Sequence, residues 1–445
     1  MHTWYEQAVF YHIYPLGLLG AEKTNTLTET AHRLTELESW IPHISDLNGS
    51  AIYIGPLFES CTHGYDTKDF RLVDRRLGSN EDFARFVRLC HENGIRVVVD
   101  GVFNHTGREF FAFQDIREKR EASPYKDWYR GVNFGWGSPL GDPFGYEAWQ
   151  GHFELPCLNL RNPEVRQYLF DSIQFWVDNF NIDGIRLDCA NVLDFGFMKE
   201  LREKTSAMKP DFWLMGEVIH GEYNRWVNPE MLHSVTNYEL HKALYSGHND
   251  HNYFEIAHNV RRLEAVGRSL YTFVDNHDED RIASKLNNLA NLFPVYQLLF
   301  TLPGIPSVYY GSEWGIEGKR SRTSDEVLRP ALNLSDMHGK APELASHIAA
   351  LGKIHTENDA FHNGSYKELL LTNRQYAFSR SGEHGTVISA VNNDEQPASI
   401  SIPLPCAASD VVSLLPGEIP FSLENGRLSV TLPANGGAIF KLQEV

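Results

Sequence analysis

Three carboxylates follow separate apolar runs of the chain, and they could together perform nucleophilic and acid–base chemistry. They are Asp188, Glu217 and Asp278. A carboxylate in apolar surroundings is costly unless it is paired, solvated or used. Two of them held close together suit cleavage of a glycosidic bond, in which one attacks the anomeric carbon and the other protonates the leaving oxygen.

The neighbours of Asp188 indicate that it is the nucleophile. In Gly184–Ala190, Arg186 precedes Asp188 by two residues, and positions i and i+2 of a strand share one face. A guanidinium on that face would keep the nucleophile ionised. When two carboxylates share a poorly solvated cleft, the pKa of one of them rises, and that one can act as the acid. Cys189, beside the nucleophile, is interpreted as a small apolar filler.

These residues need a scaffold that brings strand ends together. Short apolar runs alternate with amphipathic stretches through three-quarters of the chain, which predicts an α/β fold, a parallel (β/α)8 TIM barrel. An open doubly wound sheet is the alternative, and the lack of a glycine-rich phosphate loop after the first strand weakens it. The eight predicted strands are Val9–Tyr14, Ala51–Ile54, Ile95–Asp100, Gly184–Asp188, Phe212–Glu217, Ser234–Asn237, Leu270–Asn276 and Ser307–Tyr310.

Helices are predicted where apolar residues recur at i, i+3 and i+4. Asn80 is expected to cap one of them, and Asn162 another with Pro163 at its first position. The predicted helices are Leu27–Leu47, Glu81–Asn93, Pro163–Phe180, Phe195–Ala207 and Leu289–Leu302.

Two changes of pattern predict further parts. The stretch 105–160 is rich in Gly, Pro, Trp and Tyr and too long for an ordinary loop, so it is expected to be a subdomain inserted after the third strand. Short alternating segments after about residue 361 predict an all-β C-terminal domain, a sandwich. The expected division is a catalytic barrel over 1–104 and 161–360, an inserted subdomain over 105–160 and a β-sandwich over 361–445.

Composition narrows the classes of partner and compartment. The net charge of −18 argues against nucleic acid and anionic membranes, which select basic patches, and suits a neutral substrate. There is no apolar run of membrane-spanning length, and the N-terminus lacks the features of a signal peptide. The five cysteines suggest neither a disulfide framework nor a zinc spacing. A cytoplasmic protein is therefore expected, and its oligomeric state stays open.

Four segments together resemble the signature motifs of the α-amylase family of glycoside hydrolases. They are Val97–His105, Gly184–Ala190, Met215–Val218 and Phe273–Asp278, in the family's order. Leu155–Asn159 and Gly304–Gly311 are similar to two weaker motifs.

The resemblance implies a role for each matched residue. Asp188 would be the nucleophile, Glu217 the general acid/base and Asp278 the transition-state stabiliser of a retaining enzyme that cleaves α-1,4-glucosidic bonds. The implied substrate-binding residues at the −1 and −2 subsites are Tyr65, His105, Arg186, His277, Asp325 and Arg329. Asp100 is expected either to contact substrate or to be scaffold.

Finer details favour one subgroup. Asp188–Val192 and Glu217–His220 are similar to the cyclomaltodextrinases, neopullulanases and maltogenic amylases, which implies α-glucan oligosaccharides as substrates, with α-1,6 bonds as further targets. That subgroup carries an N-terminal domain, whereas here the first predicted strand starts by Val9. The family's calcium site uses a histidine where this chain has Val192, and Asn104 alone does not make a site. Calcium is therefore not predicted, and no metal or cofactor is required.

Two other functions stay open. An α-glucan transglycosylase would use the same covalent intermediate and pass the sugar to an acceptor. A non-catalytic glucan-binding or scaffold protein is disfavoured, because all three carboxylates are present.

Overall fold

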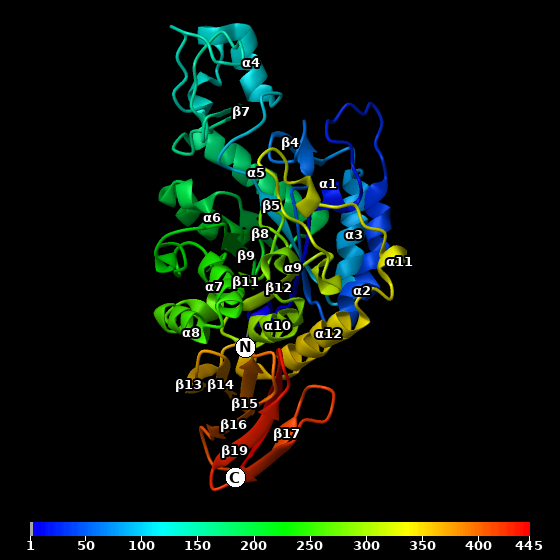
Figure 1. The fold of residues 1–445 in the computed structure, drawn as a ribbon. Helices are drawn as coiled ribbons and strands as arrows, with labels where there is room; N and C mark the ends of the chain where they lie inside the picture. Colours follow the sequence, from blue (N-terminus) through cyan, green and yellow to red (C-terminus); the bar gives the residue numbers. More distant parts are fainter. Residues whose placement is uncertain (1–2) are drawn as a thin grey trace.

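The computed structural model describes residues 3–445 and shows three parts in a row (Figure 1). An α/β body occupies the middle. The segment around α4 and β7 lies at one end, and the β-strands of the C-terminal part lie at the other. The (β/α)8 architecture with a C-terminal β part is confirmed.

Eight parallel strands form the centre, in the order β10-β9-β8-β5-β2-β1-β12-β11. A parallel bridge between Thr236, just after β10, and Tyr271 of β11 joins the two ends and closes the barrel. The sixth and seventh predicted strands are shorter than expected, and Asn237 instead caps α7. The strands are β1 Phe10–Ile13, β2 Ala51–Ile54, β5 Arg96–Gly101, β8 Gly184–Leu187, β9 Trp213–Gly216, β10 Ser234–Val235, β11 Tyr271–Phe273 and β12 Ile305–Tyr309.

Alternation along the strands divides the core in two. Phe10 of β1 belongs to a cluster with Trp213 and Tyr271 from other barrel strands, whereas Tyr11 and Ile13 belong to the larger cluster with the helices. Successive side chains of a strand point to opposite faces, so the first cluster fills the barrel and the second lies outside it.

Helices surround the barrel (Figure 1). The longest include α5, capped by Asn162 with Pro163 at its first position, as predicted. The helices are α1 Pro15–Leu18, α2 Trp40–Asp46, α3 Asn80–Glu92, α4 Phe111–Lys119, α5 Pro163–Phe180, α6 Phe195–Met208, α7 Tyr238–Asn249, α8 Tyr253–Arg262, α9 Ile282–Lys285, α10 Leu292–Thr301, α11 Leu334–Met337 and α12 Pro342–Glu357.

Two helix predictions were wrong in their boundaries. Leu27–Leu47 is not one helix: a 3-10 helix covers Arg33–Ser39 and α2 begins only at Trp40. Pro42 explains the late start, because proline has no N–H to donate and is tolerated only in the first turn of a helix.

The cap of α3 is Ser79 rather than Asn80. The Ser79 hydroxyl accepts from the N–H of Asp82 at 3.2 Å, and the Asp82 carboxylate accepts from the N–H of Ser79 at 2.8 Å. The Asn80 side chain instead accepts from the N–H of Val73 and donates to the carbonyl of Arg71, so it fixes the helix to the preceding strand β4 (Thr67–Val73).

The segment between β5 and α5 has a small core of its own. The ring of Phe113 in α4 lies 5.0–5.4 Å from those of Tyr129, Phe144 and Tyr146. The hairpin β6 (Ala148–Trp149) and β7 (His152–Pro156) belongs to it. A second hairpin, β3 (Phe58–Ser60) with β4, follows the second barrel strand.

The C-terminal part consists of two antiparallel sheets around an apolar cluster. The four predicted strands over residues 375–380, 385–392, 398–403 and 427–432 are confirmed. Gln297 of α10 donates to the carbonyls of Ala390 and Ala438, which attaches this part to the barrel. Its strands are β13 Ser365–Leu371, β14 Gln375–Gly382, β15 Gly385–Asn392, β16 Ala398–Pro403, β17 Ala408–Ser413, β18 Phe421–Glu424, β19 Arg427–Leu432 and β20 Gly436–Glu444.

Candidate active site

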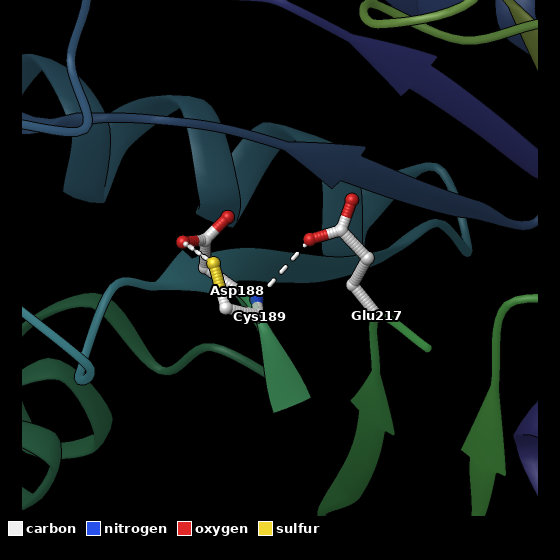
Figure 2. Close-up of side chains that lie close together, drawn as sticks. All are labelled: Asp188, Cys189 and Glu217. Atoms are coloured by element: carbon white, nitrogen blue, oxygen red, sulfur yellow. Dashed lines mark hydrogen bonds between the residues drawn. The ribbon is translucent and has the colours of Figure 1, made fainter. Parts of the chain in front are cut away.

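Asp188 and Glu217 follow adjacent strands of the barrel, β8 and β9. The N–H of Asp188 donates to Gly101 at the end of β5, and the N–H of Glu217 donates to Leu187. An oxygen of each carboxylate and the sulfur of Cys189 all lie within 4.8 Å of one another (Figure 2). The parallel register therefore brings together two groups that are far apart in the sequence.

Arg186 lies among three carboxylates. Its Nη1 donates to Oδ1 of Asp188 at 2.8 Å and to Oδ1 of Asp100 at 2.9 Å, and its Nη2 lies 3.0 Å from Oε2 of Glu217. Burial would lower the pKa of this guanidinium, but Asp100 and Glu217 raise the pKa well above its ordinary value. Arg186 is therefore a fixed positive charge at the bottom of the site.

Glu217 has the environment of an acid. Burial, with the nearby charges of Asp188 and Asp278, raises the pKa of its carboxyl to about 7 against the lowering effect of Arg186. Its Oε2 accepts from the N–H of Cys189 at 3.1 Å. A carboxyl group with this pKa holds a proton near neutral pH and can donate it.

Asp278 lies in the loop after β11, and its environment favours the ionised form. Desolvation would raise the pKa of this carboxyl, but His277 and Arg329 lower it below its ordinary value. Nη2 of Arg329 donates to Oδ1 of Asp278 at 2.8 Å, and Nε2 of His277 lies 3.1 Å from Oδ2. The environment thus favours the ionised form at Asp278 and the protonated form at Glu217 within a single cleft.

The other predicted binding residues surround these carboxylates. The Tyr65 hydroxyl contacts Nε2 of His277, and the two rings stack with centroids 5.8 Å apart. Arg329 also pairs with Asp325 at 2.6 Å. His105 is 1% exposed, and within the described chain its Nε2 has no hydrogen-bond partner. An unpaired nitrogen in such a cleft is a ready donor or acceptor for a ligand hydroxyl.

Asp100 lies below the cleft. It is 2% exposed, and its oxygens accept from Arg186 at 2.9 Å and from the hydroxyl of Tyr53 at 2.9 Å. Both oxygens are therefore occupied by protein donors, an arrangement that suits support of Arg186 better than contact with a ligand.

Sequence reasoning missed the contacts that two residues, Cys189 and Tyr238, make with the carboxylates. Cys189 is not an inert filler: its S–H donates to Oδ2 of Asp188 at 2.9 Å. Its left-handed backbone, with φ of 50°, lets the same residue reach Glu217 through its N–H. The Tyr238 hydroxyl lies 3.5 Å from Oε1 of Glu217 and accepts from Asn276 at 3.1 Å. Neither contact has a signal in residue spacing.

The residues considered for calcium have other neighbours. The side-chain amide of Asn104 lies 3.1 Å from Nδ1 of His105, and Val192 is 41% exposed. Among residues 3–445, the group of His, Cys, Asp and Glu side chains placed to share a metal ion is Asp188, Cys189 and Glu217.

The family model for the alpha-amylase catalytic domain matches residues 25–341, well over half of the chain. The chain belongs to the α-amylase family of glycoside hydrolases.

Three related proteins illustrate the extent of the similarity. A cyclomaltodextrinase from Geobacillus thermopakistaniensis is 30% identical over 99% of this chain and 78% of its own. An intracellular maltogenic amylase from Bacillus subtilis is 31% identical over 63% of this chain and 48% of its own. The crystal structure of a debranching enzyme from Nostoc punctiforme superposes with a TM-score of 0.85 at 27% identity, covering 99% of this chain and 100% of that one.

Proposed function

We propose that this α-amylase-family hydrolase cleaves α-1,4-glucosidic bonds of short maltodextrins and cyclodextrins by double displacement, with retention of anomeric configuration. The observation that carries the proposal is the closeness of the two carboxylates: one oxygen of Asp188 lies within 4.8 Å of one oxygen of Glu217. Retaining glycosidases hold the pair about 5–5.5 Å apart, whereas inverting enzymes need about 6.5–9.5 Å to admit a water.

In the first step Asp188 attacks the anomeric carbon. Arg186 orients the attacking carboxylate through its hydrogen bond to Oδ1. Glu217 gives its proton to the leaving oxygen, so the C–O bond breaks as the glycosyl–Asp188 ester forms. In the second step Glu217, now ionised, takes a proton from water, which attacks the same carbon and releases Asp188.

Asp278 and the two histidines bind the sugar ring. The ionised Asp278 stabilises the positive charge that develops on the ring in the transition state. The free Nε2 of His105 meets a sugar hydroxyl, and Tyr65 presents an aromatic face beside His277. Asp325 and Arg329 bind the next sugar. Asp100 holds Arg186 from below and acts through it.

Short α-glucans are the substrate class that the relatives support. Cyclomaltodextrinase and maltogenic amylase are the names of two of them, and a debranching enzyme shares the whole fold. The debranching relative favours α-1,6 bonds as additional targets.

We also propose that the enzyme is cytoplasmic, because the cysteines of residues 3–445 are free thiols and one relative is an intracellular enzyme. Among the helices of the same residues, none has the length and apolar character that crossing a membrane requires.

Transfer to a sugar acceptor is the second candidate, and two exposed apolar side chains favour it. Val192 and Ile219 are 41% and 43% exposed, and each lies within four residues of a catalytic carboxylate. An apolar surface there would hold an acceptor sugar where water otherwise attacks.

A product profile tests both candidates. The enzyme is incubated with maltotriose, cyclodextrin, pullulan, panose and starch, and products are separated at low and high substrate concentration. Hydrolysis predicts maltose and glucose at all concentrations, and transfer predicts products longer than the substrate at high concentration. Absence of any cleaved product from all five glucans would refute the proposed function.

A further inference from the structure

The sulfur of Cys189 lies in the catalytic cleft, pointing at the nucleophile (Figure 2). It is 2.9 Å from Oδ2 of Asp188, and the side chain is 7% exposed. The proposed hydrolysis does not use this thiol. A sulfur between two carboxylates, one from β8 and one from β9, forms a mixed set of ligand atoms from three side chains.

We propose that Asp188, Cys189 and Glu217 form a binding site for a thiophilic divalent cation such as Zn²⁺ or Cd²⁺, and that the bound cation blocks the active site. The blocking role rests on the proposed function, because it needs these carboxylates to be catalytic. The binding itself does not.

The distances fit a small cation. Zinc binds thiolate sulfur at about 2.3 Å and carboxylate oxygen at about 2.0–2.2 Å in a tetrahedron, so its ligand atoms lie about 3.5 Å from one another. The three ligand atoms here lie within 4.8 Å of one another before any adjustment. Small side-chain rotations therefore close the site, and three protein ligands leave a fourth position open.

Arg186 leaves ligand atoms available for a second cation. It contacts Oδ1 of Asp188 and Oε2 of Glu217. Oδ2 of Asp188 faces Cys189, and Oε1 of Glu217 lies 3.5 Å from the Tyr238 hydroxyl. Three carboxylates, including Asp100, also face this one guanidinium.

Among residues 3–445, a nitrogen of the cleft has no hydrogen-bond partner. Nε2 of His105 is buried and unpaired, and burial lowers the pKa of this ring although the nearby charge of Asp188 acts to raise it. The cleft therefore holds a further nitrogen that a ligand or its water could satisfy.

The sulfur of Cys189 determines which cations the site prefers. Binding forms a metal–sulfur bond, breaks the S–H bond of Cys189 and releases its proton to solvent, without electron transfer. Burial and the charges of Asp188 and Glu217 raise the pKa of the free thiol, so a cation must displace the proton. Soft thiolate ligands select zinc and cadmium, whereas calcium and magnesium need more oxygens than this site offers.

The test titrates the full chain with CdCl₂ in a chelator-free buffer and records the ultraviolet charge-transfer band of a cadmium–thiolate bond. Maltotriose hydrolysis is followed in parallel, and each rate is normalised to the same protein without metal. We expect the band to saturate at one cadmium ion per chain. Cadmium should inhibit hydrolysis, more maltotriose should relieve that inhibition, and CaCl₂ should not inhibit. In Cys189→Ala we expect the band to vanish and the inhibiting concentration to rise by about 100-fold.

Cys406→Ser is the matched control, because Cys406 is a half-buried thiol of the C-terminal part. It should keep both the band and the inhibition. Cys189→Ser, which keeps the size of the side chain, should lose the band and guards against a folding defect in the alanine variant. A band that survives in both Cys189 variants, or equal inhibition of wild type and Cys189→Ala, would overturn the proposal. If wild type shows the band but cleaves no glucan, the metal site stands and the proposed function fails.

Discussion

The Arg186 guanidinium donates a hydrogen bond of 2.8 Å to the Asp188 carboxylate, from two residues earlier on the same strand. The same guanidinium contacts Asp100 and Glu217 on the neighbouring strands. One buried cation thus holds the proposed nucleophile, its support Asp100 and the proposed acid in a single network, so loss of a member changes the others.

The nucleophile assignment predicts the outcome of Asp188→Asn. The amide has the same shape but cannot attack, so kcat on maltotriose should fall by about 10⁴-fold or more. Melting temperature should show that the fold persists. Asp178→Asn, an exposed position on α5, is the control and should keep wild-type kcat. Undiminished turnover of Asp188→Asn would contradict the assignment.

The acid role of Glu217 predicts dependence on the leaving group. In Glu217→Gln, cleavage of maltotriose should fall by about 10²- to 10⁴-fold, because the leaving oxygen is no longer protonated. Maltosyl fluoride, whose leaving group needs little protonation, should form the covalent intermediate at nearly the wild-type rate in single-turnover measurements. Equal losses on both substrates would assign Glu217 another role.

The raised pKa of Glu217 predicts an alkaline limit. The acid must carry its proton, so kcat/KM on maltotriose should fall as pH rises through about 7. The folded pKa lies above the ordinary 4.5, so the folded state holds an extra proton between these values and loses stability as pH rises across that window. Glu217→Gln removes this loss, so melting temperature relative to wild type should rise from pH 4.5 to 7. Parallel melting profiles would refute the shift.

Arg329 should matter through Asp278. Without its guanidinium the pKa of Asp278 rises and its orientation is lost, so Arg329→Met should lower kcat by about 10²-fold. Arg329→Lys keeps the charge without the planar fork and should recover part of the activity. The pH profile of kcat is the readout: its acidic limb should move to higher pH in Arg329→Met. An unmoved limb would show that Asp278 does not depend on this partner.

Asp100 is predicted to act through Arg186 rather than on substrate. Asp100→Asn should lower kcat by about 10-fold or more while KM stays close to wild type. The free energy of unfolding should fall by about 3 kcal/mol, because a buried ion pair loses one partner. Tyr53→Phe, which removes the other hydrogen bond to Asp100, should cost about 1 kcal/mol and little activity. A raised KM with unchanged kcat would instead place Asp100 against substrate.

Strand ends made the carboxylates predictable. Asp188 and Glu217 each follow a strand of a parallel barrel, and parallel register puts such positions at one mouth. The exact boundaries of the helices were harder to predict. The late start of α2 follows from the missing N–H of Pro42, and the choice of Ser79 over Asn80 as a cap depends on which backbone N–H each side chain reaches. The contacts of Cys189 with the two carboxylates could not be predicted from the sequence. They arise from its left-handed backbone and a neighbouring strand rather than from residue spacing.

The anomeric configuration of the first product tests the double-displacement mechanism most directly. Proton NMR during the first minutes of maltotriose cleavage distinguishes the α- and β-anomers of the newly formed reducing end before they interconvert. The closeness of Asp188 and Glu217 predicts that the α-anomer forms first. A β-anomer formed first would contradict the covalent intermediate on Asp188.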